Sequence, residues 1–207
     1  MKKSLPISYL FLDIGGVLLS NGWDHHARKR AAATFKLDWA AMEARHRLTF
    51  EVYEEGRLTL EEYLRLVIFH EKRSFSIAAF RKFMFAQSRP HAEMIALGAR
   101  LKDRHKLKIV VVSNEGRELN AHRVRTFKLD HFVDAFISSS AVHIRKPDVA
   151  IFRLALDVAH ASASSVLYVE DTPMFVEVAK GLAMQTILHT DYRSTCAALT
   201  SYGLDAA

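Results

Sequence analysis

Cysteine is almost absent from the sequence, which has a single one, Cys196, in 207 residues. One thiol excludes a disulfide framework and a cysteine zinc cluster, so a reducing cytoplasm is the expected compartment. Long apolar runs are absent as well. The stretch after the basic residues 1–4 is interrupted by Pro6 and Asp13 and is too short to cross a bilayer. We therefore expect no signal peptide, no transmembrane helix and no membrane partner.

Recognisable nucleic-acid motifs are also missing. The net charge is +6, but the basic residues are spread through segments that also carry Asp and Glu. The densest basic cluster, residues 25–30, comes with neither a zinc-finger spacing nor an aromatic ribonucleoprotein signature. We interpret it as a solvated helix face and expect no nucleic-acid partner, with a nucleic-acid-associated protein as a weaker alternative.

Half of the sequence is hydrophobic, which is enough for one sizeable core or for a core plus a smaller module. Short apolar runs without hydrophobic and polar alternation predict strands that are buried on both faces. Helical patterns lie between the later runs, and this alternation favours an α/β fold, a Rossmann-like parallel sheet flanked by helices. The predicted strands span 7–13, 108–113, 135–138, 166–170 and 186–189, and the predicted helices 90–105, 118–127, 147–159 and 173–182.

One long interval breaks the alternation, because no strand pattern occurs between residues 20 and 88. Thr59 and Glu62 have the spacing of a capping box and precede an apolar stripe, and a second helix begins at Ser74 or Ser76. We therefore expect an all-helical cap domain, 20–88, inserted after the first strand into a core domain formed by 1–19 and 89–207.

Polar residues end the first two long strands of the predicted core. Asp13 follows the first strand, and Gly15 and Gly16 after it let the backbone turn tightly and approach a ligand closely. A tight turn with an incidental aspartate is the alternative. Ser113 and Asn114 end the second strand, where they can hold a phosphate oxygen or form an ordinary turn.

Two further motifs lie at predicted helix starts. Lys146 precedes Pro147, which suits the first position of a helix, so this cation would lie beside a positive helix end unless an anion is held nearby. An exposed loop lysine is the alternative. Glu170 and Asp171 follow a buried strand, where two adjacent acids need a cation or solvent, unless Asp171 simply caps the next helix.

The order of these motifs, Asp, then Ser, then Lys, then an acidic pair, resembles the haloacid dehalogenase-like superfamily over essentially the whole chain. The first motif is most similar to the phosphatase branch that reads Asp-x-Gly. The resemblance implies that Asp13 is the nucleophile that forms an aspartyl-phosphate. It also implies that Ser113, Asn114, Lys146 and the close backbone at Gly16 bind the phosphoryl group, and that Mg²⁺ is held by Asp13, the Gly15 carbonyl, Glu170 and Asp171.

The first motif departs from the usual pattern at one position. The second aspartate of the family, which protonates the leaving group, is replaced by Gly15, and loss of such a group typically costs about 10²–10⁴-fold in rate. A good leaving group would need little protonation, or Asp24, His25 or His26 of the cap would supply the proton. A polar helix start is the alternative for these three. Phe175 and Ala183 also depart from the fourth motif, away from the expected chemistry.

We therefore expect a Mg²⁺-dependent phosphatase of a small phosphorylated metabolite, such as a sugar phosphate, in a monomer or homodimer. Dehalogenation is disfavoured, because a halide needs no Mg²⁺. The alternative is a phosphatase-like binding or regulatory protein with little turnover because of Gly15. The sequence leaves open the substrate, the group that replaces the missing acid and the oligomeric state.

Overall fold

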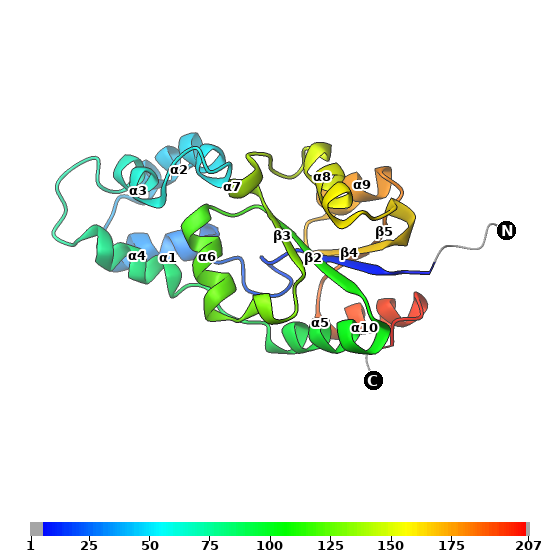
Figure 1. Cartoon of the computed structure of the whole chain (residues 1–207). Helices are drawn as coiled ribbons and strands as arrows, with labels where there is room; N and C mark the ends of the chain where they lie inside the picture. The colour runs from blue at the N-terminus through cyan, green and yellow to red at the C-terminus, as the bar shows by residue number, and fades with distance from the viewer. Residues whose placement is uncertain (1–5, 206–207) are drawn as a thin grey trace.

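The computed structural model describes residues 6–205 and contains one parallel sheet with a helical cap beside it (Figure 1). The sheet has the strand order β3-β2-β1-β4-β5 and all neighbouring pairs are parallel. The expected α/β fold class is confirmed. The strands are β1 (Tyr9–Leu12), β2 (Lys108–Ser113), β3 (Ala135–Ser138), β4 (Val166–Glu170) and β5 (Gln185–Leu188).

Helices cover both faces of the sheet, because the strands bury side chains on both sides (Figure 1). On one face, Leu10 and Leu12 pack in a cluster with residues of α5 (Ala92–His105) and α10 (Tyr192–Ser201). On the other face, Phe11 and Val110 pack with residues of α8 (Val149–Ala159) and α9 (Pro173–Gly181). The remaining elements are α6 (Arg117–Thr126), α7 (Ser139–Val142) and the short helices η1 (Leu129–His131) and η2 (Ala163–Ser165).

Four helices form the insert between β1 and α5, and we call them the cap. They are α1 (His25–Phe35), α2 (Trp39–Glu54), α3 (Leu60–Val67) and α4 (Ile77–Phe85). Thr59 and Glu62 form the predicted capping box at the start of α3, and Ser76 caps α4. The cap has an apolar cluster that includes Tyr63, Phe80 and Met84, and Leu119 of α6 packs with it. The division into 1–19 with 89–207 and 20–88 stays a prediction.

Two chain segments connect the cap to the core and run side by side. The Ser20 amide donates to the Arg89 carbonyl oxygen at 2.8 Å, and the Arg89 amide donates to Ser20 Oγ at 3.0 Å. The Ser20 hydroxyl in turn lies 3.2 Å from the Gln87 carbonyl oxygen. These contacts fix the exit and the return of the chain next to each other, as an inserted module requires.

One predicted helix start was wrong. Pro147 is not the first residue of α8, because the helix begins at Val149 and Asp148 caps it by accepting from the Ala150 amide at 2.8 Å. No helix within residues 6–205 has the length and apolar composition needed to cross a bilayer. The basic residues 1–4 lie outside the described part of the chain.

Candidate functional site

A cavity of about 530 Å³ lies between the core and the cap. Its core wall is formed at the carboxyl ends of β1, β2 and β4, the usual place for ligands in open α/β sheets. Leu12 pairs with Val111 on one side and with Val169 on the other, so Asp13 follows at the level of Val112 and Glu170. The register of the central strand therefore brings separate motifs of the sequence to one point.

Three carboxylates meet at that point, as the motifs predicted. Asp13, Glu170 and Asp171 each offer an oxygen within 4.8 Å of the others. Glu170 is fully buried, and its oxygens accept from Lys146 Nζ at 2.7 Å, from the Thr172 amide at 3.0 Å and from the Tyr168 hydroxyl. Asp171 is partly exposed and does not cap α9, whose start has no side-chain cap. Asp171 is therefore the more accessible member of the acidic pair.

Lys146 is buried and not an exposed loop lysine, since only 1% of its surface is accessible. Its Nζ lies 3.2 Å from Asp13 Oδ1 and 2.7 Å from Glu170 Oε2, and it donates to the Tyr168 hydroxyl at 3.1 Å. Burial lowers the pKa of Lys146, but the carboxylates of Asp13 and Glu170 outweigh it, so the pKa lies above its usual value. The amine stays charged beside the Asp13 carboxylate.

Phe175 is closer to this chemistry than the sequence indicated. Its ring centroid lies 4.9 Å from Lys146 Nζ, and the side chain lines the cavity. Phe175 therefore lies against Lys146, one of the predicted site residues, although the sequence had placed it away from the expected chemistry. Ala183 has a φ of 65°, a left-handed conformation that glycine adopts more easily than alanine.

The surroundings of Asp13 disfavour the charged form of its carboxylate. Burial raises its pKa to about 7; Lys146 opposes this rise, and Glu170 and Asp171 add to it. The Ile14 amide donates to Asp13 Oδ1 at 2.8 Å and also stabilises the charged form. Three carboxylates around one lysine leave an excess of negative charge, so the cluster has the charge and the hard oxygen donors that suit a divalent cation.

The two glycines of the first motif have different surroundings. Gly16 has a φ of 73°, and a Cβ there would lie 1.9 Å from Asp171 Oδ2, so only glycine fits. A Cβ at Gly15 would lie 2.7 Å from Oδ1 of Asn21, whose Nδ2 donates to Asp171 Oδ2 at 3.3 Å. Asn21 therefore occupies the space next to the position where the family places its second aspartate.

Ser113 and Asn114 lie in the cavity wall, as predicted, but the amide of Asn114 has a second role. Asn114 Nδ2 donates to the Lys146 carbonyl oxygen, and the Lys146 amide donates to Asn114 Oδ1, both at 2.8 Å. This pair of hydrogen bonds holds the Lys146 loop against the end of β2. A phosphate contact by Ser113 or Asn114 stays a prediction.

The cap contributes residues that the motifs did not indicate. Arg28 donates to both carboxylate oxygens of Glu43 at 2.9 Å, and the pair is buried in the cavity wall. The Tyr63 hydroxyl accepts from Trp23 Nε1 and contacts His46 Nδ1, each at 2.9 Å. Burial lowers the pKa of His46 to about 4, so this imidazole is neutral at physiological pH.

The histidines that the sequence offered as proton donors are not in the cavity wall. His25 and His26 are exposed on α1, and neither lines the cavity. Asp24 does line it, but its carboxylate accepts from the Ala27 amide at 2.6 Å and caps α1, which is the alternative that the sequence had favoured. The basic cluster is divided as well, because Arg28 is buried against Glu43. It does not form one solvated face.

A further buried ion pair lies next to the second motif. Arg123 of α6 pairs with Glu115, the residue after Asn114, and donates to the Ser20 carbonyl oxygen between core and cap. Burial lowers the pKa of Arg123 to about 10 while the charge of Asp13 opposes the shift, so the guanidinium is charged. Sequence reasoning missed this pair, because the two residues carry no motif.

Comparison with known proteins gives a family and a set of similar structures. The family model described as haloacid dehalogenase-like hydrolase matches residues 49–189. The comparison with curated proteins gave no match.

Similar solved structures cover nearly the whole chain. A HAD family enzyme from Bacteroides thetaiotaomicron, in complex with magnesium and inorganic phosphate, is 21% identical with a TM-score of 0.73, over 90% of this chain and 97% of that one. A predicted HAD-like family hydrolase from Porphyromonas gingivalis is 18% identical with a TM-score of 0.76, over 95% and 98%. The L-2-haloacid dehalogenase from Xanthobacter autotrophicus, with chloropropionic acid covalently bound, is 16% identical with a TM-score of 0.63, over 96% and 84%. Identities this low show the shared fold alone.

Proposed function

The chain belongs to the haloacid dehalogenase-like hydrolases, and we propose that it is a Mg²⁺-dependent phosphatase that acts on a small phosphorylated metabolite through an aspartyl-phosphate at Asp13. One observation carries the proposal. A buried lysine lies 3.2 Å from the carboxylate of Asp13, inside a cluster of three acids, two of which, Asp13 and Asp171, line a cavity of metabolite size.

The first step is attack by an Asp13 carboxylate oxygen on phosphorus. A new oxygen–phosphorus bond forms while the ester bond of the substrate breaks, and the leaving oxygen takes up a proton. Lys146 and Ser113 would bind the equatorial phosphate oxygens, and the charge of Lys146 offsets the repulsion between a carboxylate and a phosphate dianion. Asn114 keeps Lys146 in place through its two hydrogen bonds to the lysine backbone.

In the second step, water attacks the phosphorus of the aspartyl-phosphate. The bond between Asp13 and phosphorus breaks, which releases inorganic phosphate and restores the carboxylate. The proton chemistry of both steps lacks the usual second aspartate, since Gly15 carries no side chain. Substrates with a good leaving group, such as anomeric sugar phosphates, acyl phosphates and aryl phosphates, suit this site best, because a loose transition state then needs little protonation.

The acidic cluster has the composition that Mg²⁺ prefers. Asp13, Asp171 and the Gly15 carbonyl would hold the ion, with Glu170 as the third acid of the cluster. Glu170 also keeps Lys146 in place, since the lysine Nζ lies 2.7 Å from its carboxylate. When bound, Mg²⁺ supplies positive charge that neutralises the phosphate and the developing charge of the transition state. The Bacteroides thetaiotaomicron enzyme of the same fold was crystallised with magnesium and phosphate, which supports this choice of ion.

A binding or regulatory protein is the second candidate function. The observation that favours it is that any side chain at Gly15 would meet Asn21, an amide that lies next to the place of the usual acid and cannot donate a proton to a leaving group. This candidate predicts that phosphate and Mg²⁺ bind without release of product.

Phosphate release from a panel of anomeric sugar, acyl and aryl phosphates tests the proposal. Wild type with Mg²⁺ should release phosphate from at least one class, and Asp13→Asn should reduce that rate by at least about 10³-fold, because the nucleophile is lost. Addition of EDTA should abolish turnover, and excess Mg²⁺ should restore it. Equal rates for wild type and Asp13→Asn on every substrate would remove the enzymatic assignment.

A further inference from the structure

One buried hydroxyl beside the proposed reaction centre has no part in the two proposed steps. Tyr168 of β4 is fully buried in the apolar cluster on one face of the sheet, and its ring centroid lies 5.4 Å from that of Phe152. Tyr168 does not line the cavity. A phenylalanine would fill the same space without a polar atom that needs a partner, so the hydroxyl indicates a polar role.

The hydroxyl lies between the lysine and one acid of the cluster. Tyr168 and Glu170 are two residues apart on one strand, so their side chains point to the same face of the sheet. The Tyr168 hydroxyl donates to Glu170 Oε2 and accepts from Lys146 Nζ at 3.1 Å. The directions of both hydrogen bonds are fixed, because an ammonium group can only donate and a carboxylate can only accept. The hydroxyl therefore joins the two charged groups.

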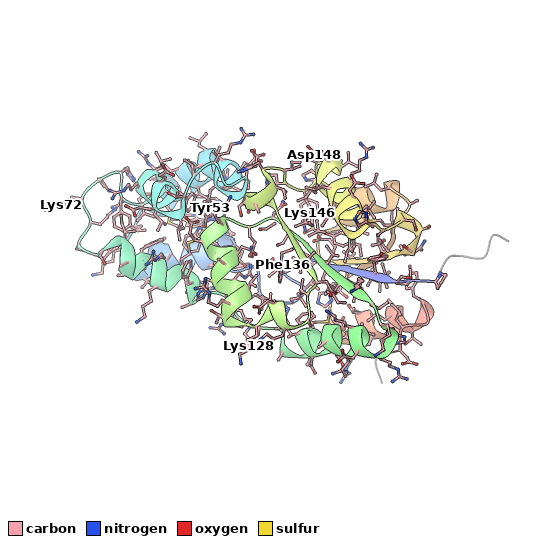
Figure 2. All side chains as sticks on the ribbon, viewed as in Figure 1. Tyr53, Lys72, Lys128, Phe136, Lys146 and Asp148 are labelled. Carbon is pink, nitrogen blue, oxygen red and sulfur yellow. The ribbon has the colours of Figure 1, made fainter. Side chains whose placement is uncertain are left out.

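The contacts of Lys146 use two of its three N–H groups. In the loop before α8, where Figure 2 shows this lysine, Nζ donates to the Tyr168 hydroxyl and to Glu170 Oε2. The third N–H is left for Asp13, whose Oδ1 lies 3.2 Å from Nζ. The Phe175 ring also lies against the ammonium group, with its centroid 4.9 Å from Nζ, but it offers no oxygen. The first two acceptors therefore fix the direction of the third N–H.

The same hydroxyl also holds the Glu170 carboxylate in one orientation. Oε2 accepts from Lys146 at 2.7 Å and from Tyr168, whereas Oε1 accepts from the Thr172 amide at 3.0 Å, just before α9. With two donors on Oε2 and the amide on Oε1, the carboxylate cannot turn without breaking a hydrogen bond. The acceptor that Glu170 offers to the lysine is therefore fixed as well.

We propose that Tyr168 is a positioning residue, whose hydroxyl orients Lys146 so that its third N–H faces Asp13 and the phosphoryl group bound there. The hydroxyl lines no part of the cavity and acts through the lysine. Its loss would leave one N–H of a buried ammonium group without an acceptor, and the ammonium group would turn about its remaining bond to Glu170. The proposal rests on the phosphate site of the proposed function.

Inorganic phosphate is the probe for the test, and calorimetry with Mg²⁺ measures its affinity for the full-length protein. Tyr168→Phe keeps the ring and removes the hydroxyl. It should weaken phosphate binding about 10-fold, because a hydrogen bond that orients a charged group is lost. Wild-type affinity for phosphate in this variant overturns the proposal.

Tyr9→Phe is the matched control. Tyr9 packs against the same apolar cluster, but it lies at the start of β1, at the opposite end of that strand from Asp13. The same loss of a hydroxyl there should leave the affinity for phosphate at the wild-type level. An equal loss of affinity in Tyr9→Phe and Tyr168→Phe contradicts the proposal, because the effect would then come from the cluster and not from the lysine.

A double-mutant cycle with Lys146→Met separates positioning of the lysine from a structural role of the hydroxyl. If Tyr168 acts through Lys146, adding Tyr168→Phe to Lys146→Met should change the phosphate affinity by no more than about twofold. The same 10-fold loss in both backgrounds overturns the proposal, because the hydroxyl would then act without the lysine. In that case the phosphatase function stands.

Crystal structures keep the proposal testable if Lys146→Met does not fold or if the protein binds no phosphate. In Tyr168→Phe, Lys146 Nζ should lose its contact with Asp13 Oδ1, while the ring at position 168 keeps its place in the apolar cluster. A displaced lysine in a protein that binds no phosphate supports the positioning role even though the phosphatase function has failed. A lysine in the same place in both proteins overturns the proposal.

Discussion

Replacement of Gly16 by alanine tests the geometry of the site through a single methyl group. The backbone has a φ of 73° at this position, and the new Cβ would lie 1.9 Å from Asp171 Oδ2. Ordinary van der Waals contact begins at 3.4 Å, so the carboxylate or the loop has to move by about 1.5 Å. The substitution therefore displaces a proposed metal ligand without removing any polar group.

The expected size of the effect follows from two separate costs. The left-handed backbone strain of alanine is about 1–2 kcal/mol in the free energy of unfolding. Displacement of a catalytic group by about 1 Å can cost 10²-fold in rate. We therefore expect Gly16→Ala to lose about 10²-fold in kcat/KM and to bind Mg²⁺ at least about 10-fold more weakly.

Gly203 provides the control for the backbone strain. It has a φ of 76°, and a Cβ there would have no neighbour within 4 Å. Gly203→Ala should lose the same 1–2 kcal/mol in thermal unfolding but keep the wild-type rate and Mg²⁺ affinity. If calorimetry and phosphate release show Gly16→Ala to be as active and to bind Mg²⁺ as tightly as Gly203→Ala, the reasoning about Asp171 is refuted.

Three further predictions follow from the contacts of the site and of the cap. Lys146→Met leaves two buried carboxylates without their cation. Chemical denaturation should therefore show a loss of about 3–5 kcal/mol in the free energy of unfolding, and phosphate release should be lost as well. A variant as stable as wild type would contradict the ion-pair geometry. Gly15→Asp should raise the turnover of substrates with poor leaving groups by up to about 10²-fold. The gain should be larger in combination with Asn21→Ala, which makes room for the new side chain. No gain in the double variant would show that the missing acid does not limit the rate. Burial holds the pKa of His46 at about 4 in the folded protein, below its usual 6.5. The unfolded chain therefore takes up a proton at a higher pH than the folded protein does. The free energy of unfolding should fall by up to about 3 kcal/mol as the pH drops from about 6.5 to 4. His46→Gln should flatten that fall in acid denaturation, whereas the exposed His26→Gln should not.

The sequence indicated which residues would lie together, because its motifs follow strands. Asp13, Ser113 and the acidic pair each lie at the carboxyl end of a strand of one parallel sheet, and parallel pairing aligns such ends. The five strands and the helices α5, α6, α8 and α9 could be predicted for the same reason, since each is a local pattern, whereas α10 was not predicted. The predicted start of α8 at Pro147 was wrong, because Asp148 caps the helix and places Pro147 before its first turn.

The contacts on the cap side of the cavity could not be predicted, because they join residues that are far apart in the sequence. Arg28 of α1 reaches Glu43 of α2, and Tyr63 of α3 joins His46 of α2 and Trp23, which precedes α1. The same holds for His25 and His26, which are near the expected site in the sequence but lie on the exposed side of α1. A helix pattern gives the face that is buried, but not the neighbour that it is buried against.

The most direct test of the central claim is a crystal structure of the protein grown with Mg²⁺ and beryllium fluoride, which mimics an aspartyl-phosphate. The account predicts density for the mimic on a carboxylate oxygen of Asp13, within reach of Lys146 and Ser113, and a cation at Asp13 and Asp171. Asp13→Asn crystals treated in the same way should lack the mimic. A mimic bound at another side chain, in a protein that releases phosphate under the same conditions, would contradict the assignment of Asp13 as the nucleophile.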